Sequence, residues 1–128
     1  AAEVMEHVLH EPQAFVAHEP LPMDELRTAS SAISIDPEGF RRVLVTYAMP
    51  CELMSRPGLH LVIASERGPV TLLVIVDVRV SESRLVSREG FRGVVKPIRD
   101  GSVAVIGAPD APIEQLAQDL TPYVHVRG

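Results

Sequence analysis

The chain has 128 residues, of which 46% are hydrophobic and 23% charged, and its formal net charge is −5. This length and composition suit one globular domain over residues 1–128 and exclude a disordered or collagen-like chain. The longest fully apolar run, residues 72–76, is far shorter than the ~20 residues that a membrane helix needs. The acidic balance and the scattered basic residues argue against nucleic-acid binding.

Residues 1–35 are predicted to be the helical part of the domain. Val4 and Val8, with Leu9 beside them, are spaced like one edge of a short helix over residues 2–10. Pro22 suits the first turn of a second helix over about residues 22–31. All six charged residues within residues 1–26 are acidic. We therefore expect two short helices on an acidic segment.

Residues 40–107 are predicted to form a sheet. Runs rich in β-branched residues favour strands at 42–47, 59–64, 70–78, 91–98 and 102–106, with short additional strands near 85–86 and 123–126. The run at 70–78 does not alternate between apolar and polar residues, so we expect a central strand covered on both faces. Residues 65–68 and 99–101 are typical of hairpin turns.

Residues 110–121 are predicted to form the C-terminal helix. Asp110 suits the N-cap, and a stripe of apolar side chains follows at helical spacing: Ile113, Leu116, Ala117 and Leu120. The predicted fold class is α+β. It comprises a mainly antiparallel sheet of four to six strands, with two short N-terminal helices and one C-terminal helix packed on it.

The most distinctive cluster of potential ligands is formed by Met49, Cys51, Met54 and His60. If the strands around them pair as a hairpin, the side chains come close together, and Met49 and Cys51 share one face. Thioether, thiolate and imidazole groups suit copper(I), and the cysteine and histidine also suit zinc. The alternative is structural, with the cysteine and methionines packed under a loop and His60 hydrogen-bonded at a strand start.

His7 and His10 form a second candidate pair. Their spacing puts them on one face of the predicted first helix, and each adjoins a glutamate. Neighbouring carboxylates favour the protonated imidazole, so the pair would suit a response to mild acid or metal binding. The alternative is a solvated acidic helix with no such role.

A thiol enzyme built on Cys51 and His60 is a further alternative. Such a site needs the imidazole to hold the thiolate, a third residue to orient the ring, and an oxyanion hole. No nearby residue obviously supplies the last two, so we expect no enzyme activity.

Several segments of the chain resemble a bacterial family. They are Val45-Thr46-Tyr47-Ala48-x-Pro50-Cys51, His60-Leu61-Val62, residues 68–73, residues 101–107 and His7-Val8-x-x-Glu11-Pro12. The chain thereby resembles the extracytoplasmic C-terminal domain of an uncharacterised family of anti-sigma-factor-like inner-membrane proteins. The resemblance implies a periplasmic domain anchored by a membrane helix upstream of residue 1.

The expected function is non-enzymatic sensing or regulation, with a protein partner or self-association. The state of the compartment, or a bound partner, would pass to the membrane through residues 1–20 by a shift in the population of short, marginally stable helices. No cofactor is required, and copper or zinc is the ion that the alternative metal site would take.

Overall fold

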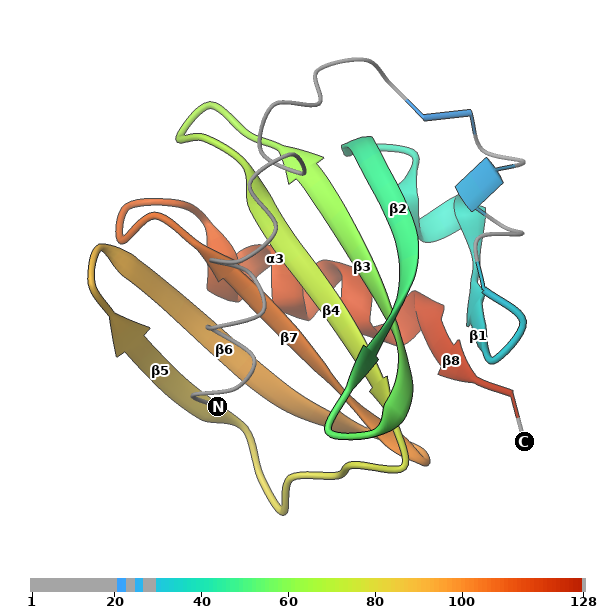
Figure 1. Ribbon diagram of the computed structural model, residues 1–128. Helices are drawn as coiled ribbons and strands as arrows, with labels where there is room; N and C mark the ends of the chain where they lie inside the picture. Colours follow the sequence, from blue (N-terminus) through green and yellow to red (C-terminus); the bar gives the residue numbers. More distant parts are fainter. Residues whose placement is uncertain (1–20, 23–24, 27–29, 128) are drawn as a thin grey trace.

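The computed structural model describes residues 21–22, 25–26 and 30–127 (Figure 1). In this part of the chain, one antiparallel sheet has the strand order β2-β3-β4-β7-β6-β5. Its strands are β2 (Leu44–Leu53), β3 (Arg56–Ala64), β4 (Val70–Val76), β5 (Arg84–Arg88), β6 (Phe91–Ile98) and β7 (Gly101–Gly107). A separate antiparallel pair joins β1 (Ile33–Ile35) to β8 (Val124–Val126). Helix α3 (Ile113–Leu120) is followed directly by the 3-10 turn η3 (Thr121–Tyr123), and a second 3-10 turn, η2 (Pro37–Phe40), contacts both of them.

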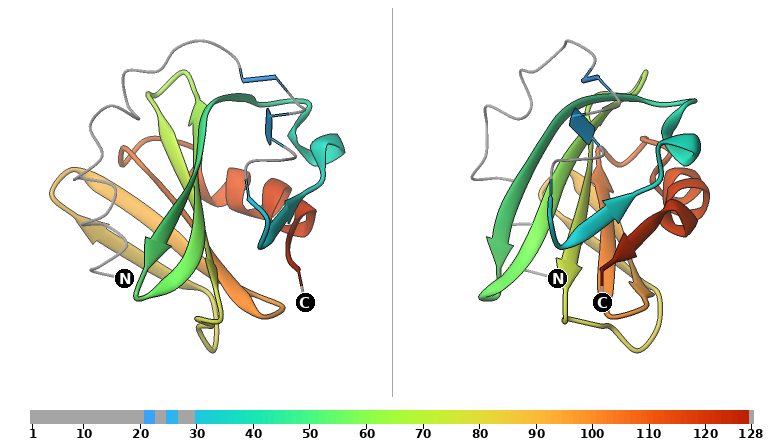
Figure 2. Two further views of the ribbon diagram at one scale, coloured as in Figure 1. Left: turned by 45° about the vertical axis from the view of Figure 1, so that its right-hand side comes forward. Right: turned by 90° about the vertical axis from the view of Figure 1, so that its right-hand side faces the viewer.

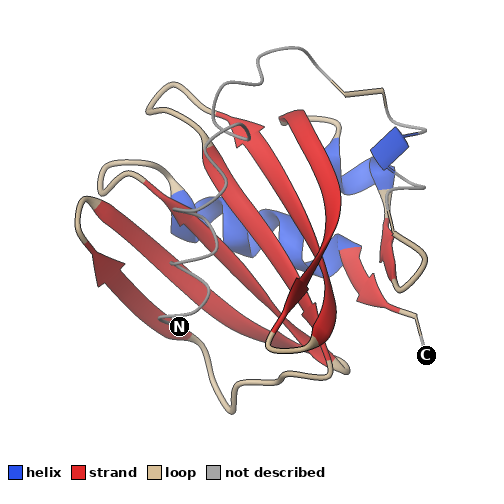
Figure 3. Ribbon diagram, viewed as in Figure 1, coloured by secondary structure: helices blue, strands red, loops and turns tan. Residues whose placement is uncertain are grey.

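The predicted α+β class is wrong, because the described chain is mainly β (Figure 3). Within the second predicted helix, Glu25 and Leu26 are helical, whereas the other described residues, Pro22 and Ser30, are not. The predicted helical part also contains β1, since Ile33 and Ile35 are both buried and pair with β8. The predicted helix over residues 2–10 lies outside the described residues. The C-terminal helix is present as α3.

One face of the sheet, here the first face, is covered by other elements. Helix α3 packs on it through Ile113, Ala117 and Leu120, which are buried. The β1–β8 pair lies on the same side as α3, as Figure 2 shows. The first face and its cover therefore make the larger hydrophobic core.

The described residues contain no helix long and apolar enough to cross a membrane.

The opposite side of the sheet, here the second face, carries a smaller apolar cluster. Its buried members are Leu53, Leu73, Ile75, Val95, Ala104 and Ile106. Partly buried side chains pack against them: Cys51, Val78, Val80, Val86 and Phe91. Strand β4 contributes to both faces, and all seven of its residues are buried. This burial agrees with the central position predicted for residues 70–78, since β3 and β7 flank β4.

The β2–β3 hairpin is longer than predicted. The sequence predicted a strand over residues 42–47. Strand β2 instead continues through Pro50 to Leu53. Proline is tolerated here because β2 is an edge strand, whose outward N–H groups need no partner in the ladder. Met54 and Ser55 form the two-residue turn, both with positive φ (51° and 62°).

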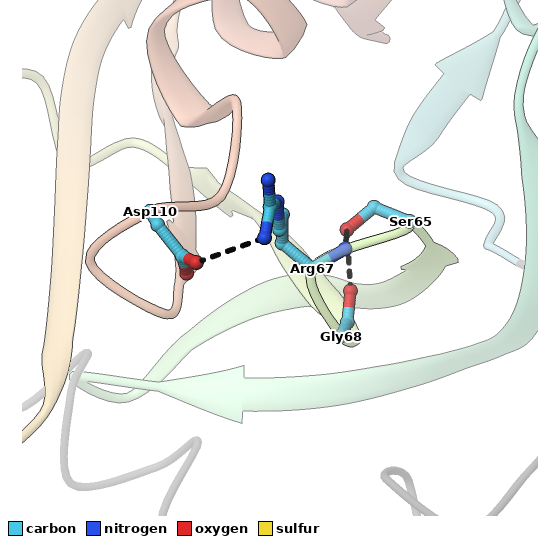
Figure 4. A network of polar contacts seen from close by, with 4 residues as sticks. All are labelled: Ser65, Arg67, Gly68 and Asp110. Carbon is cyan, nitrogen blue, oxygen red and sulfur yellow. Dashed lines mark hydrogen bonds and ion pairs between the residues drawn. The ribbon is translucent and has the colours of Figure 1, made fainter.

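Three polar contacts involve the β3–β4 turn (Figure 4). The hydroxyl of Ser65 donates to the carbonyl oxygen of Gly68 at 2.6 Å and accepts from the Arg67 N–H at 3.2 Å. The guanidinium of Arg67 lies 3.7 Å from the carboxylate of Asp110, in the loop before α3. The predicted hairpin turn at residues 65–68 is present.

At the other edge of the sheet, β5 pairs only with β6 among the described strands. It is short and largely exposed, and Leu85 keeps 72% of its surface accessible. Arg84 and Arg88 lie at its two ends.

Candidate functional site on the second face

The register of β2 and β3 brings three of the predicted ligands onto one face. Met49 lies directly opposite His60, and Cys51 lies opposite Gly58. A Cβ atom added to Gly58 would lie 3.1 Å from the Cys51 sulfur, so the thiol sits over that glycine. His60 is fully buried and Cys51 half-buried, whereas Met49 is 50% exposed. His60 lies on the inner strand β3, and Met49 and Cys51 lie on the edge strand β2; these three side chains are here called the row.

A β-bulge adds an aromatic ring to this row. The register shifts between Val45 and Tyr47, so Thr46 is the extra residue and Tyr47 comes to face Val62. The Tyr47 ring meets the His60 ring edge-on, with centroids 5.3 Å apart. Bulges commonly redirect a side chain in this way. Hydrophobic patterning gives no signal for a bulge, so the sequence did not predict that Tyr47 lies beside His60.

Met54 does not join this row. It lies in the hairpin turn, five residues beyond the Met49–His60 pair, which corresponds to roughly 16 Å along a strand. The described residues also contain no group of three or more His, Cys, Asp or Glu side chains arranged to hold a metal. Among the described residues, the predicted ligands left for a metal site here are therefore Met49, Cys51 and His60.

Three buried polar side chains lie on the second face. Directly opposite residues of an antiparallel pair have side chains on the same face. His60 lies opposite Leu73, Thr71 opposite Ile106, and Ser102 opposite Ile75. Because these three partners belong to the second-face cluster, the polar side chains lie on that face too. Ser102 donates to the Val78 carbonyl oxygen and accepts from the Val80 N–H at 3.3 Å. The hydroxyl of Thr71 is fully buried and has no hydrogen-bond partner among the described residues.

Arginines border the second face. The register places Arg56 opposite Leu53, Arg84 opposite Val95 and Arg88 opposite Phe91, and those three partners belong to the second-face cluster. All three arginines are exposed, and Arg56 lies 3.9 Å from Asp77. No carboxylate on the described strands projects from this face. The second face is thus an apolar surface with a positively charged rim.

A comparison with known protein families matches residues 1–124 to the family described as a protein of unknown function (DUF3379). The chain belongs to this family. The expectation of an uncharacterised family is confirmed to that extent. No curated protein matches the chain, and no solved structure matches it. The family description assigns no activity, so the function of this member has to be argued from its site.

Other surfaces of this family member offer less chemistry. A hollow of about 710 Å³ lies between η2 and α3, lined by both acidic and basic groups: Glu38, Arg41, Arg42 and Asp119. Arg41 is already paired with Glu38 at 2.8 Å. This mixed lining favours neither an anion nor a cation, and none of the predicted ligands among the described residues lines it.

The remaining predicted ligands, His7 and His10, lie outside the described residues. The first described residue is Leu21, whose N–H donates to the carbonyl oxygen of Val45 at 2.7 Å. Because Val45 belongs to β2, Leu21 lies beside the β2 edge of the sheet.

Proposed function

We propose that this chain is a non-enzymatic regulatory domain that works by binding a protein segment on the second face of its sheet. The observation that carries the proposal is an apolar face that holds three buried polar side chains and a rim of exposed arginines. Interfaces with partner proteins combine an apolar centre and a polar rim in this way. Arginine is also among the residues enriched at such surfaces.

The setting proposed for this activity is extracytoplasmic, in a membrane-anchored protein of the anti-sigma-factor-like type. The support is the resemblance of the segments around Tyr47, His60 and residues 101–107 to that family. A reporter enzyme that is active only outside the cytoplasm, fused after residue 128 of the full-length gene product, tests the location. Cytoplasmic reporter activity would contradict it.

Regulation is tested by transcription profiling after deletion of this domain from the full-length gene product. We expect a set of transcripts to change and the parent domain to restore them. The double variant Arg84→Glu/Arg88→Glu should fail to restore them, because it reverses the charge of the rim. A matched control, Arg99→Glu/Arg127→Glu, makes the same charge change at exposed positions away from that rim. Equal restoration by both variants would contradict regulation through the second face.

A second candidate function is binding of a soft metal ion, and the Met49–His60 pairing with Cys51 nearby supports it. We propose anaerobic thermal melting of the reduced protein with copper(I) and, separately, with zinc(II). A ligand at a hundredfold its Kd adds about 2.7 kcal/mol of stability. Met49→Leu and Cys51→Ala should reduce the copper(I) shift, while Met54→Leu, in the turn, should keep it. No shift in the parent protein would exclude the metal site.

The thiol-enzyme alternative is separated by the rate at which Cys51 is alkylated. A reactive thiolate labels fast at neutral pH, whereas a packed thiol labels slowly. We expect slow labelling, because Cys51 is half-buried against the second-face cluster. Fast labelling together with loss of regulation in Cys51→Ser would favour a thiol enzyme.

A further inference from the structure

Of the two edges of the large sheet, β5 is the one suited to accept a further strand. The other edge, β2, carries a bulge at Thr46 and also Pro50, which has no N–H to donate. The carbonyl oxygen of Val45 on β2 already accepts from Leu21. Strand β5 has no such obstruction, since its register with β6 runs over residues 84–88 without a shift. Figure 1 shows β5 on the outer side of β6, and four of its five residues are exposed.

The backbone of β5 directs the polar groups of two residues outward. The β5–β6 hairpin closes with a two-residue turn, Glu89 and Gly90, which both have positive φ (36° and 83°). A turn of this kind makes Arg88 the first hydrogen-bonded residue of the ladder, and hydrogen-bonded and non-hydrogen-bonded pairs then alternate along it. The N–H and C=O groups of Leu85 and Ser87 therefore point away from β6, toward the side where a further strand would pair.

The side chains of β5 indicate what such a strand would carry. Arg84 and Arg88 lie on the second face, and Val86, which packs against the second-face cluster, lies between them. Leu85 lies opposite Val94 of the larger core, so it is on the first face, and 72% of its surface is exposed. One face of β5 is thus basic, apolar and basic in turn, and the other offers an exposed leucine.

We propose that β5 binds an extended acidic segment of a partner protein, which adds to the sheet as an antiparallel strand. The segment carries an acidic residue opposite Arg84 and another opposite Arg88, with an apolar residue opposite Val86. In recognition by strand addition, main-chain hydrogen bonds give affinity and alternate side chains give specificity. The inference rests on the proposed function, because it names the part of the partner that meets the arginine rim.

Charge complementarity supports an acidic occupant and fixes its position. Opposite charges at directly paired positions of neighbouring strands stabilise the pair. Glu82 lies just before β5 and Glu89 just after it, and both are exposed. The positive charge is therefore confined to the span between Arg84 and Arg88, and an acidic segment that slides along the edge meets a carboxylate. Complementarity of this kind sets the register of an interface.

The binding test uses the full chain and a synthetic peptide with the central sequence Glu-Thr-Val-Val-Glu. In antiparallel register its glutamates face the two arginines, and its middle valine faces Val86. We expect amide hydrogen exchange at Leu85 and Ser87, followed by nuclear magnetic resonance, to slow on peptide addition because their outward N–H groups gain partners. Exchange at Val86, whose N–H faces β6, should change little.

A control peptide contains the same five residues with the two glutamates adjacent. Neighbouring side chains of a strand point to opposite faces, so only one of these glutamates can meet an arginine. We expect the control peptide to bind severalfold more weakly than the first peptide.

Variants of β5 separate the backbone from the charge. Ser87→Pro removes one outward N–H and no charge, and edge strands tolerate proline. It should lose peptide binding, whereas its control, Ser87→Ala, should keep it. Arg84→Glu/Arg88→Glu should weaken binding by about tenfold or more, because two attractive pairs become repulsive. The matched control Arg99→Glu/Arg127→Glu should bind like the parent chain.

The inference is overturned if the parent chain does not bind the peptide, or binds it without protecting the amides of Leu85 and Ser87. Equal binding by Ser87→Pro and Ser87→Ala would also overturn it. Protection that exists before the peptide is added would mean that the edge is already occupied, and its loss on dilution would identify a second copy as the occupant.

The same variants distinguish a failure of this inference from a failure of the proposed function. Peptide binding at β5 together with full restoration of transcription by Arg84→Glu/Arg88→Glu would contradict the proposed function and leave the strand site standing. Transcription that depends on these two arginines without peptide binding at β5 would support the proposed function and overturn strand addition.

Discussion

Thr71 carries a hydroxyl group in the interior of the second face, with no partner for it among the described residues. Leaving a buried hydroxyl unsatisfied costs about 1–3 kcal/mol. We therefore expect Thr71→Val to raise the free energy of unfolding by about 1 kcal/mol, because valine keeps the branched shape and loses only the polar group. Urea denaturation measures the change. Destabilisation would mean that the hydroxyl is hydrogen-bonded in the folded protein.

Ser102 is the matched opposite case on the same face. Its hydroxyl joins the Val78 carbonyl and the Val80 N–H to β7, so Ser102→Ala should cost about 1–3 kcal/mol. Hydrogen exchange at Val80 should accelerate at the same time. The exposed Ser87→Ala on β5 is the control and should change stability by less than about 0.5 kcal/mol. A Ser102→Ala variant as stable as this control would show that the loop is held by other contacts.

At the scale of elements, the β2–β3 turn stores backbone strain. Both turn residues, Met54 and Ser55, have positive φ, a region that costs roughly 1 kcal/mol for most side chains. Asparagine and glycine suit a two-residue turn of this kind. Met54→Asn/Ser55→Gly should therefore stabilise the protein by about 1–2 kcal/mol in urea denaturation.

Gly68 supplies the contrast for that test. It also has positive φ (98°), and an added Cβ would meet nothing within 4 Å. Gly68→Ala should then lose about 1 kcal/mol from backbone strain alone. If neither turn responds as expected, the positive φ values do not govern the stability of these hairpins.

Local patterning predicted the elements whose partners are close in sequence. The β3–β4 hairpin and helix α3 follow from runs and stripes that a short window contains. The predicted helical part over residues 1–35 was wrong at its end, because Ile33–Ile35 form a strand that pairs with β8, about ninety residues later, and no local pattern indicates such a distant partner. For the candidate site, a hairpin was enough to predict that Met49 and His60 meet. Met54 was misplaced because β2 runs on beyond Pro50.

At the scale of the whole molecule, the two faces of β4 can be compared through adjacent leucines. Leu72 lies on the first face and Leu73 on the second face, and both are fully buried. If both faces are covered in solution, Leu72→Ala and Leu73→Ala should each cost about 2–5 kcal/mol. Urea denaturation of the two variants compares the faces directly. A Leu73→Ala variant that costs much less than its neighbour would show that the second face is open.

The exposed edge strand β5 has a consequence for how the protein behaves in concentrated solution. An unpaired strand edge is a template for aggregation, and charged side chains on it are a common protection. A second molecule adding to β5 in antiparallel register around Val86 would place Arg84 of one copy against Arg88 of the other. Such like-charge pairs are destabilising, and salt screens them. Replacing both arginines by alanine should make the protein precipitate at concentrations where the parent stays dissolved. Replacing both by glutamate should not, because like charges of either sign repel a second copy of β5.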